Sequence, residues 1–168
     1  MELYVIRHGI AQQLERENEF SDEKRTLTKE GRERLSEEVK GLRKLGVEFD
    51  LMLTSPLIRA VETAEIIAAA MGLGKKDVRT TANLAPGAPA NVLFAEIKSH
   101  AGAESIALVG HQPDLGILAS RIIQSEVDAI QLKKGGVCCI NLSQTVPTLR
   151  GELVWLLTPR QLRLLARV

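Results

Sequence analysis

The chain has 168 residues, a length typical of one domain, and its composition of 45% hydrophobic and 26% charged residues is typical of a globular protein. Lysine and arginine number 22 against 21 aspartate and glutamate residues, which gives a net charge of +1, and aromatic residues make up only 3%. This balance argues against a nucleic-acid partner, a membrane partner and a disordered chain. We therefore expect one domain over residues 1–168 with an aliphatic core.

The chain carries two cysteines, Cys138 and Cys139, which are adjacent in an apolar stretch. Neighbouring residues of a strand point to opposite faces, so we expect both thiols in the core and no disulfide between them. The N-terminal apolar run is too short for a signal peptide or a membrane span, and a cytoplasmic protein is the expectation.

Short apolar runs alternate with helical patterns along the chain. Patterns typical of strands cover residues 3–6, 51–53, 78–81, 105–109, 136–142 and 152–157. Helical patterns begin near Thr28, Ser55, Ala90, Pro113 and Pro159. We expect loops over residues 10–26 and 82–90. This alternation predicts a three-layer α/β/α sandwich with a mostly parallel central sheet.

Two helix starts carry specific signals. Thr28 is expected to be the N-cap of a helix that ends before Gly46. Ser55 is expected to be the N-cap of the next helix, with Pro56 as its first residue and Gly72 as its stop.

Cationic and imidazole side chains follow three of the predicted strands. Arg7-His8-Gly9 follows the first strand, Arg59 lies just inside the helix after the second, and His111 follows the strand at 105–109. Ligands of open α/β sheets bind at the carboxyl ends of the strands. Two guanidinium groups and two imidazoles gathered there favour an anion, and a phosphate dianion is the natural occupant.

Four blocks of the sequence resemble the histidine phosphatase superfamily, the phosphoglycerate mutase-like enzymes. In chain order they are LYVIRHG at 3–9, LTKEG at 27–31, TSPLIRAVETA at 54–64 and VGHQP at 109–113. Four ordered blocks are far more specific than an isolated RHG triplet. The length and the third block are most similar to the small SixA-type protein phosphohistidine phosphatases. The resemblance implies one histidine phosphatase domain with a phosphoglycerate mutase-like fold.

The resemblance also implies roles for four residues. His8 would be the nucleophile that is phosphorylated transiently, and Arg7, Arg59 and His111 would hold the phosphoryl oxygens. Guanidinium groups supply the positioning and charge stabilisation that phosphoryl transfer needs, so we expect neither a metal nor a cofactor. To attack, His8 must be neutral at one ring nitrogen while an acceptor such as a loop carbonyl holds the other N–H.

The chain departs from the wider family in the segment 83–89. Many members place a glutamate there to protonate an alkoxide leaving group, whereas this segment contains no carboxylate. An imidazole leaves phosphohistidine without such an acid, because its ring nitrogen is protonated near neutral pH. The departure favours cleavage of P–N bonds. Glu62, Asp114 and Glu15 stay open as alternative proton donors.

We therefore expect a phosphohistidine phosphatase that acts on a phosphorylated protein partner, as in phosphorelay signalling, through a phosphohistidine enzyme intermediate. Two alternatives stay open. One is a phosphomonoesterase for a small sugar or nucleotide-like phosphate, and the other is a catalytically silent phosphate-binding module.

The candidate residues also have ordinary structural interpretations. His8 and His111 could simply stabilise a strand end and a helix start, and Arg59 could form a surface salt bridge with Glu62 or Glu65. A zinc site built from the histidines would leave the arginines without a role. Arg25 is expected to face solvent rather than to bind substrate.

Overall fold

The computed structural model describes residues 1–13, 22–144 and 148–168. Within them, six strands form one sheet: β1 (Glu2–Arg7), β2 (Leu51–Thr54), β3 (Val78–Thr80), β4 (Ser105–Gly110), β5 (Val137–Gln144) and β6 (Arg150–Leu157). The α-helices are α1 (Lys29–Lys44), α2 (Ile58–Met71), α3 (Ala90–Ser99), α4 (Asp114–Ile122) and α5 (Pro159–Leu165). Short 3₁₀ turns at Asp22–Lys24, Lys75–Asp77 and Ala82–Leu84 were not predicted from the sequence.

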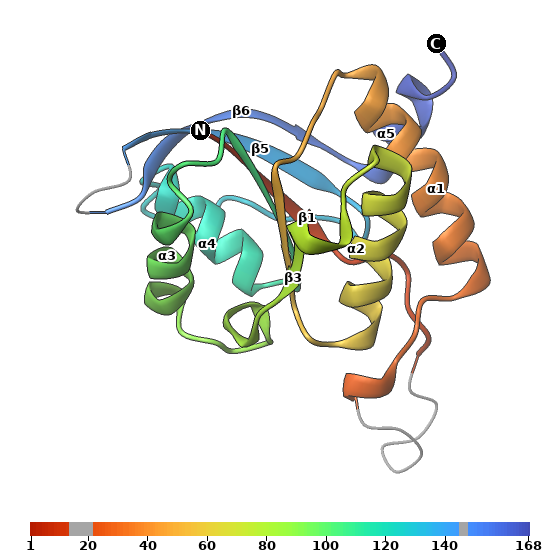
Figure 1. Cartoon of the computed structure of the whole chain (residues 1–168), viewed down its shortest axis with the longest axis horizontal. Coiled ribbons are helices and arrows are strands. Elements are labelled where there is room, and N and C mark those ends of the chain that lie inside the picture. The colour runs from red at the N-terminus through yellow and green to blue at the C-terminus, as the bar shows by residue number, and fades with distance from the viewer. Residues whose placement is uncertain (14–21, 145–147) are drawn as a thin grey trace.

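The sheet has the strand order β3-β2-β4-β1-β5-β6, and helices cover both of its faces (Figure 1). The four strands from β3 to β1 are parallel, whereas β5 and β6 pair in the antiparallel sense. Helices α3 and α4 pack on one face, and α1, α2 and α5 pack on the other. The predicted α/β/α sandwich with a mostly parallel sheet is confirmed. The central strands β2 and β4 are buried along their whole length, as expected for strands covered on both faces.

The apolar core is divided by the sheet into two clusters. Cys138 faces the cluster beneath α3 and α4, and Cys139 faces the cluster beneath α1, α2 and α5. Both thiols are buried and neither forms a disulfide, so the predicted core role is confirmed. In the described part of the chain, no helix is both long enough and apolar enough to span a membrane.

The predicted helix signals are confirmed at α1 and corrected at α2. Thr28 caps α1, and its hydroxyl accepts a hydrogen bond from Gly31 N. The prediction for Ser55 and Pro56 was wrong, because α2 begins at Ile58 with Leu57 as its N-cap. Ser55 N donates to Val109 O on β4, which extends the pairing of β2 with β4 by one residue. The helix therefore starts later in the chain than predicted.

Gly31 brings the first turn of α1 against the chain that follows β1. A Cβ atom at this position would lie 2.1 Å from the carbonyl oxygen of Ile10, which itself accepts a hydrogen bond from Thr28 N. Only a glycine permits this approach, because backbone atoms cannot yield as a flexible side chain can. The glycine of the LTKEG block therefore fixes the position of the segment Gly9-Ile10 beside α1.

We predict that Gly31→Ala destabilises the protein, although alanine normally favours a helix. The methyl group forces the backbone at Ile10 to move, and overpacking of this kind costs about 1–3 kcal/mol in the free energy of unfolding. Urea denaturation measures the change, with the exposed α1 substitution Ser36→Ala as control. Equal stability of the Gly31→Ala and wild-type proteins would show that the close approach is not a constraint.

Candidate active site

Parallel strand pairing brings the predicted site residues to one edge of the sheet. Arg7 pairs with Gly110 at the ends of β1 and β4, and Thr54 pairs with Val109 at the end of β2. His8 N then donates to Gly110 O at 3.0 Å, so the segments that follow β1 and β4 begin next to each other. The residues that follow the three strands therefore converge, as the sequence predicted.

His8 is a buried imidazole with one nitrogen held by the backbone. Its Nδ1 atom lies 2.7 Å from Gly9 O, and since a carbonyl oxygen only accepts, Nδ1 carries the proton and Nε2 carries the lone pair. Burial, opposed by the bond to Gly9 and reinforced by the nearby charges, lowers the pKa of His8 to about 3. His8 is therefore neutral near pH 7, with its lone pair on Nε2.

Arg59 approaches His8 from the first turn of α2. The guanidinium Nε donates to His8 Nε2 at 3.3 Å, Nη1 donates to Asp22 O at 2.6 Å, and Nη2 donates to the Asp22 carboxylate at 2.8 Å. Only 4% of Arg59 is exposed. The alternative of a surface salt bridge with Glu62 or Glu65 is thus wrong for this residue.

His111 completes the imidazole pair after β4. Its Nε2 lies 2.7 Å from Ser55 Oγ, and its ring centroid lies 5.2 Å from that of His8. Burial, with a smaller contribution from Arg59, lowers the pKa of His111 to about 4. Its Nδ1 is buried and has no hydrogen-bond partner among the described residues, which leaves one polar atom to be satisfied by a ligand.

Arg7 is the last residue of β1, directly before His8. Its Nη1 donates to Leu132 O at 2.8 Å, whereas its buried Nε has no partner in the described part of the chain. Burial lowers the pKa of the guanidinium, as expected for a cation withdrawn from water. Arg7 is therefore a second group in this region with an unsatisfied donor.

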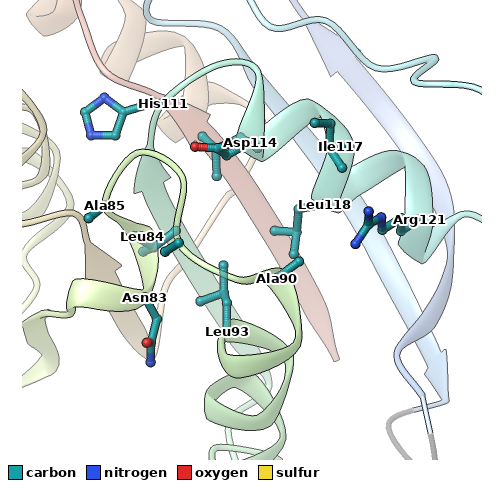
Figure 2. Close-up of a pocket in the computed structure, with 12 residues that line it drawn as sticks. Asn83, Leu84, Ala85, Ala90, Leu93, His111, Asp114, Ile117, Leu118 and Arg121 are labelled. Atoms are coloured by element: carbon teal, nitrogen blue, oxygen red, sulfur yellow. The ribbon is translucent and has the colours of Figure 1, made fainter.

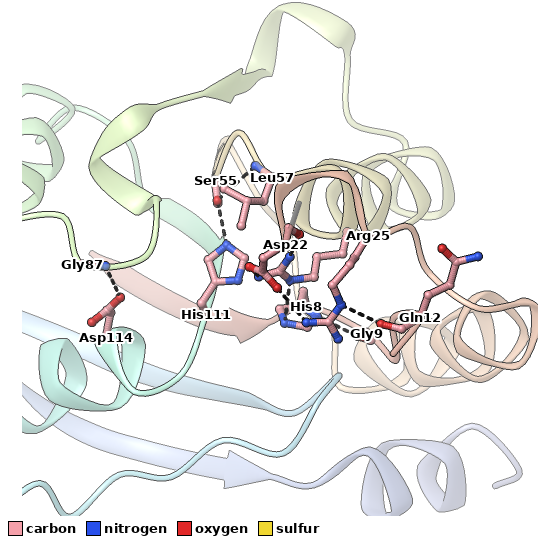
Figure 3. A network of polar contacts seen from close by, with 11 residues as sticks. His8, Gly9, Gln12, Asp22, Arg25, Ser55, Leu57, Gly87, His111 and Asp114 are labelled. Atoms are coloured by element: carbon pink, nitrogen blue, oxygen red, sulfur yellow. Dashed lines mark hydrogen bonds and ion pairs between the residues drawn. The ribbon is translucent and has the colours of Figure 1, made fainter. Parts of the chain in front are cut away.

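Asp22 and Arg25 join the site, and neither was expected there from the sequence (Figure 3). Arg25 Nη1 donates to Asp22 at 2.8 Å, and its Nε donates to Gln12 O at 2.6 Å. Burial opposes ionisation of Asp22, but hydrogen bonds from Arg25 and Arg59 outweigh it and lower the pKa of this carboxyl group. The Arg25 side chain is only 19% exposed, so the prediction that it faces solvent was wrong.

Of the other carboxylates proposed as proton donors, Glu62 is engaged with the α1 side of the structure, whereas Asp114 lines a cavity next to His111. Glu62 accepts a hydrogen bond from Leu27 N at 2.6 Å and pairs with Arg32 on α1. Asp114 accepts a hydrogen bond from Gly87 N at 2.8 Å. Glu15 lies outside the described residues.

The site as a whole suits an oxyanion. Arg7, Arg59, His8 and His111 come together as predicted, and the carboxylate of Asp22 accepts hydrogen bonds from Arg59 and Arg25. Among the described residues, no group of three or more His, Cys, Asp or Glu side chains is placed to hold a metal ion. Charge-assisted hydrogen bonds from guanidinium groups are the strong contacts of phosphate sites in proteins.

Sequence reasoning missed three residues of the site, which are Ser55, Asp22 and Arg25. Ser55 directly follows β2, so the rule that ligands bind at strand ends would have placed it in the site. Asp22 and Arg25 come from a long polar segment in which acidic and basic residues alternate without a period, and nothing in that pattern distinguishes them.

Comparisons with known proteins identify the family. Residues 3–85 match the model of the histidine phosphatase superfamily (branch 1). An uncharacterized protein of Picosynechococcus sp. is 40% identical over 140 residues, which cover 82% of this chain and 82% of that protein. The chain belongs to the histidine phosphatase superfamily.

Solved structures share the fold over almost the whole chain. The protein histidine phosphatase SixA complexed with tungstate superimposes with a TM-score of 0.84 at 22% identity, covering 96% of this chain and 99% of that one. The alpha-ribazole phosphatase from Shigella flexneri gives a TM-score of 0.69 at 22% identity, covering 90% and 95%. Together with the family match, these similarities support phosphatase activity for this protein, and phosphatases are hydrolases.

We predict that neither His8 nor His111 becomes protonated between pH 5 and pH 8 in the ligand-free protein. Burial holds both pKa values below this range, at about 3 and about 4. NMR spectra of ¹⁵N-labelled imidazoles recorded across this range measure both the charge and the tautomer. We expect His8 as the neutral Nδ1–H form throughout. A His8 titration centred near the ordinary value of about 6.5 would contradict the burial described above.

We also predict that Asp22→Asn binds oxyanions more tightly than the wild type. The wild-type carboxylate competes with the anion for Arg59 Nη2 and Arg25 Nη1, and the neutral amide of asparagine holds these two groups more weakly. Because Asp22 is 47% exposed, solvent screening limits the gain to about three- to tenfold in Kd.

Calorimetric titration with vanadate measures this affinity. The substitution Glu23→Gln, at the exposed neighbouring position, serves as the matched control. Weaker binding by Asp22→Asn would mean that Asp22 mainly orients the arginines and does not compete with the anion.

Proposed function

We propose that the protein is a metal-independent phosphohistidine phosphatase in which His8 is the nucleophile. The observation that carries the proposal is the state of His8: Nδ1 is held by Gly9 O, and Nε2 presents a lone pair next to Arg59. A binding module needs cationic groups, but it has no use for a neutral imidazole oriented in this way. The silent phosphate-binding module is therefore disfavoured.

The oxyanion contacts follow from the donors that the site leaves available. Arg59, once released from Asp22, donates to phosphoryl oxygens, and the unpartnered Nε of Arg7 supplies a further donor. Ser55 Oγ accepts from Leu57 N and can donate its own proton to His111 Nε2, which leaves the proton of His111 on Nδ1. His111 is then a neutral hydrogen-bond donor to the phosphoryl group.

The reaction takes place in two displacements. His8 Nε2 attacks phosphorus, the bond to the leaving group breaks, and the electron pair departs with that group. Water then attacks the phosphorylated His8, and its proton passes to solvent as the P–N bond electrons return to Nε2. Charge stabilisation by Arg7 and Arg59 takes the place that Mg²⁺ has in many phosphoryl-transfer enzymes.

The choice of substrate rests on the segment 83–89. The segment itself contains no carboxylate to protonate an alkoxide leaving group, and imidazole needs no such donor. Of the described carboxylates proposed as donors, Asp114 is the one that contacts this segment, through Gly87 N. The structural similarity to the protein histidine phosphatase SixA supports the same choice. The similarity to alpha-ribazole phosphatase keeps a small-molecule phosphomonoesterase as the second candidate. A phosphohistidine-bearing protein in the cytoplasm is the partner that we propose.

A substrate panel tests this function. We expect the protein to hydrolyse a phosphohistidine protein and p-nitrophenyl phosphate in excess EDTA, and to act far more slowly on a sugar phosphate, whose alkoxide leaves poorly. Comparable kcat/KM values for the sugar phosphate would favour the small-molecule phosphomonoesterase. Loss of activity in EDTA that a divalent ion restores would contradict metal independence.

We predict that Arg59→Ala lowers kcat/KM for p-nitrophenyl phosphate more than about tenfold, since a charge-assisted hydrogen bond contributes about 1.5–3 kcal/mol. The exposed α1 substitution Arg43→Ala is the matched control and keeps wild-type activity. A loss of similar size in both variants would show that Arg59 acts only through the overall charge of the protein.

A further inference from the structure

A cavity of about 180 Å³ opens beside His111, between α4 and the segment that leads into α3 (Figure 2). Its walls are mainly apolar, with Leu84, Ala85 and Leu118 among them, and Asp114 and Arg121 are the charged residues that line it. The cavity shares His111 with the site described above and so adjoins it.

The size of the cavity restricts what it can hold. Its volume of about 180 Å³ is well above the roughly 10–15 Å³ of such space that one water molecule needs. It is below the range of about 300–1,000 Å³ typical of pockets that enclose larger ligands. A single five-membered ring with a short alkyl stem suits this space.

Asp114 places a carboxylate in this cavity. Its Oδ2 accepts a hydrogen bond from Gly87 N at 2.8 Å, which ties α4 to the segment 83–89. Its Oδ1 has no hydrogen-bond partner among the described residues, and Figure 3 shows His111 between His8 and Asp114. An acceptor with an open position therefore lies on the far side of His111 from the nucleophile.

We propose that the cavity receives the imidazole ring of the phosphohistidine substrate, and that Asp114 selects this ring by accepting a hydrogen bond from the nitrogen opposite the phosphorylated one. The inference rests on the proposed function and adds the residue that distinguishes a P–N substrate from a P–O substrate. An aryl or alkyl phosphate carries no N–H at this position, so it cannot donate this hydrogen bond to Asp114.

The proton balance of the transfer step explains why such an acceptor helps. The bond from His8 Nε2 to phosphorus forms, the P–N bond of the substrate breaks, and its electron pair stays on the leaving nitrogen. The opposite N–H remains on the leaving ring throughout, just as His8 keeps its proton on Nδ1 and donates it to Gly9 O. Both rings thus have their distal N–H held by an oxygen. A carboxylate favours the protonated form of the substrate ring, which is the form that leaves as neutral imidazole.

Asp114→Asn tests the assignment. Asparagine keeps a carbonyl oxygen for Gly87 N, so the link to the segment 83–89 survives, but it removes the charge that favours a protonated ring. We expect the ratio of kcat/KM for a phosphohistidine peptide to kcat/KM for p-nitrophenyl phosphate to fall about tenfold at pH 8. The exposed substitution Asp128→Asn is the matched control and keeps the wild-type ratio.

The pH profile supplies a second measurement that a merely structural role would not change. With the wild type, activity on the phosphohistidine peptide should extend to higher pH than with Asp114→Asn, because the carboxylate raises the pKa of the substrate ring. An unchanged ratio and an unchanged profile overturn the inference. A wild type that hydrolyses p-nitrophenyl phosphate but no phosphohistidine overturns the proposed substrate, and this inference with it.

Discussion

The parallel pairing of β1 and β2 with β4 is the constraint on which the site depends. It aligns the last residues of three strands, so that the segments leaving them start at one edge of the sheet. Two backbone hydrogen bonds, from His8 N to Gly110 O and from Ser55 N to Val109 O, continue this alignment beyond the strands. A shift in the register of β1 against β4 would move His8 away from His111 and disrupt the site.

Gathering two guanidinium groups and two imidazoles in a buried site carries an electrostatic cost. The protein limits this cost by keeping both imidazoles neutral and by supplying Arg59 with the carbonyl and carboxylate oxygens of Asp22. The compensation is incomplete, because Arg7 Nε and His111 Nδ1 are buried without partners in the described part of the chain. A phosphoryl group would offer acceptors to both, whereas the Asp22 carboxylate contacts Arg59 and Arg25.

Local patterns were sufficient for most of the fold. Apolar runs and helix caps such as Thr28 predicted the order of strands and helices, because each signal acts over a few residues. The misplaced start of α2 shows where this fails: the backbone of Ser55 pairs with Val109, a contact more than fifty residues away that no local pattern contains. The predicted site residues directly follow strands or begin helices, whereas Asp22 reaches Arg59 through a long-range contact.

Trapping the covalent intermediate tests the central role of His8 most directly. Rapid acid-free quenching during turnover of a ³²P-labelled aryl phosphate, followed by peptide mapping, should place an acid-labile and base-stable phosphoryl group on His8. The variant His8→Ala should show neither label nor turnover while retaining the wild-type circular dichroism spectrum. Normal turnover by His8→Ala, or a label on a different residue of the wild type, would contradict the nucleophilic role of His8.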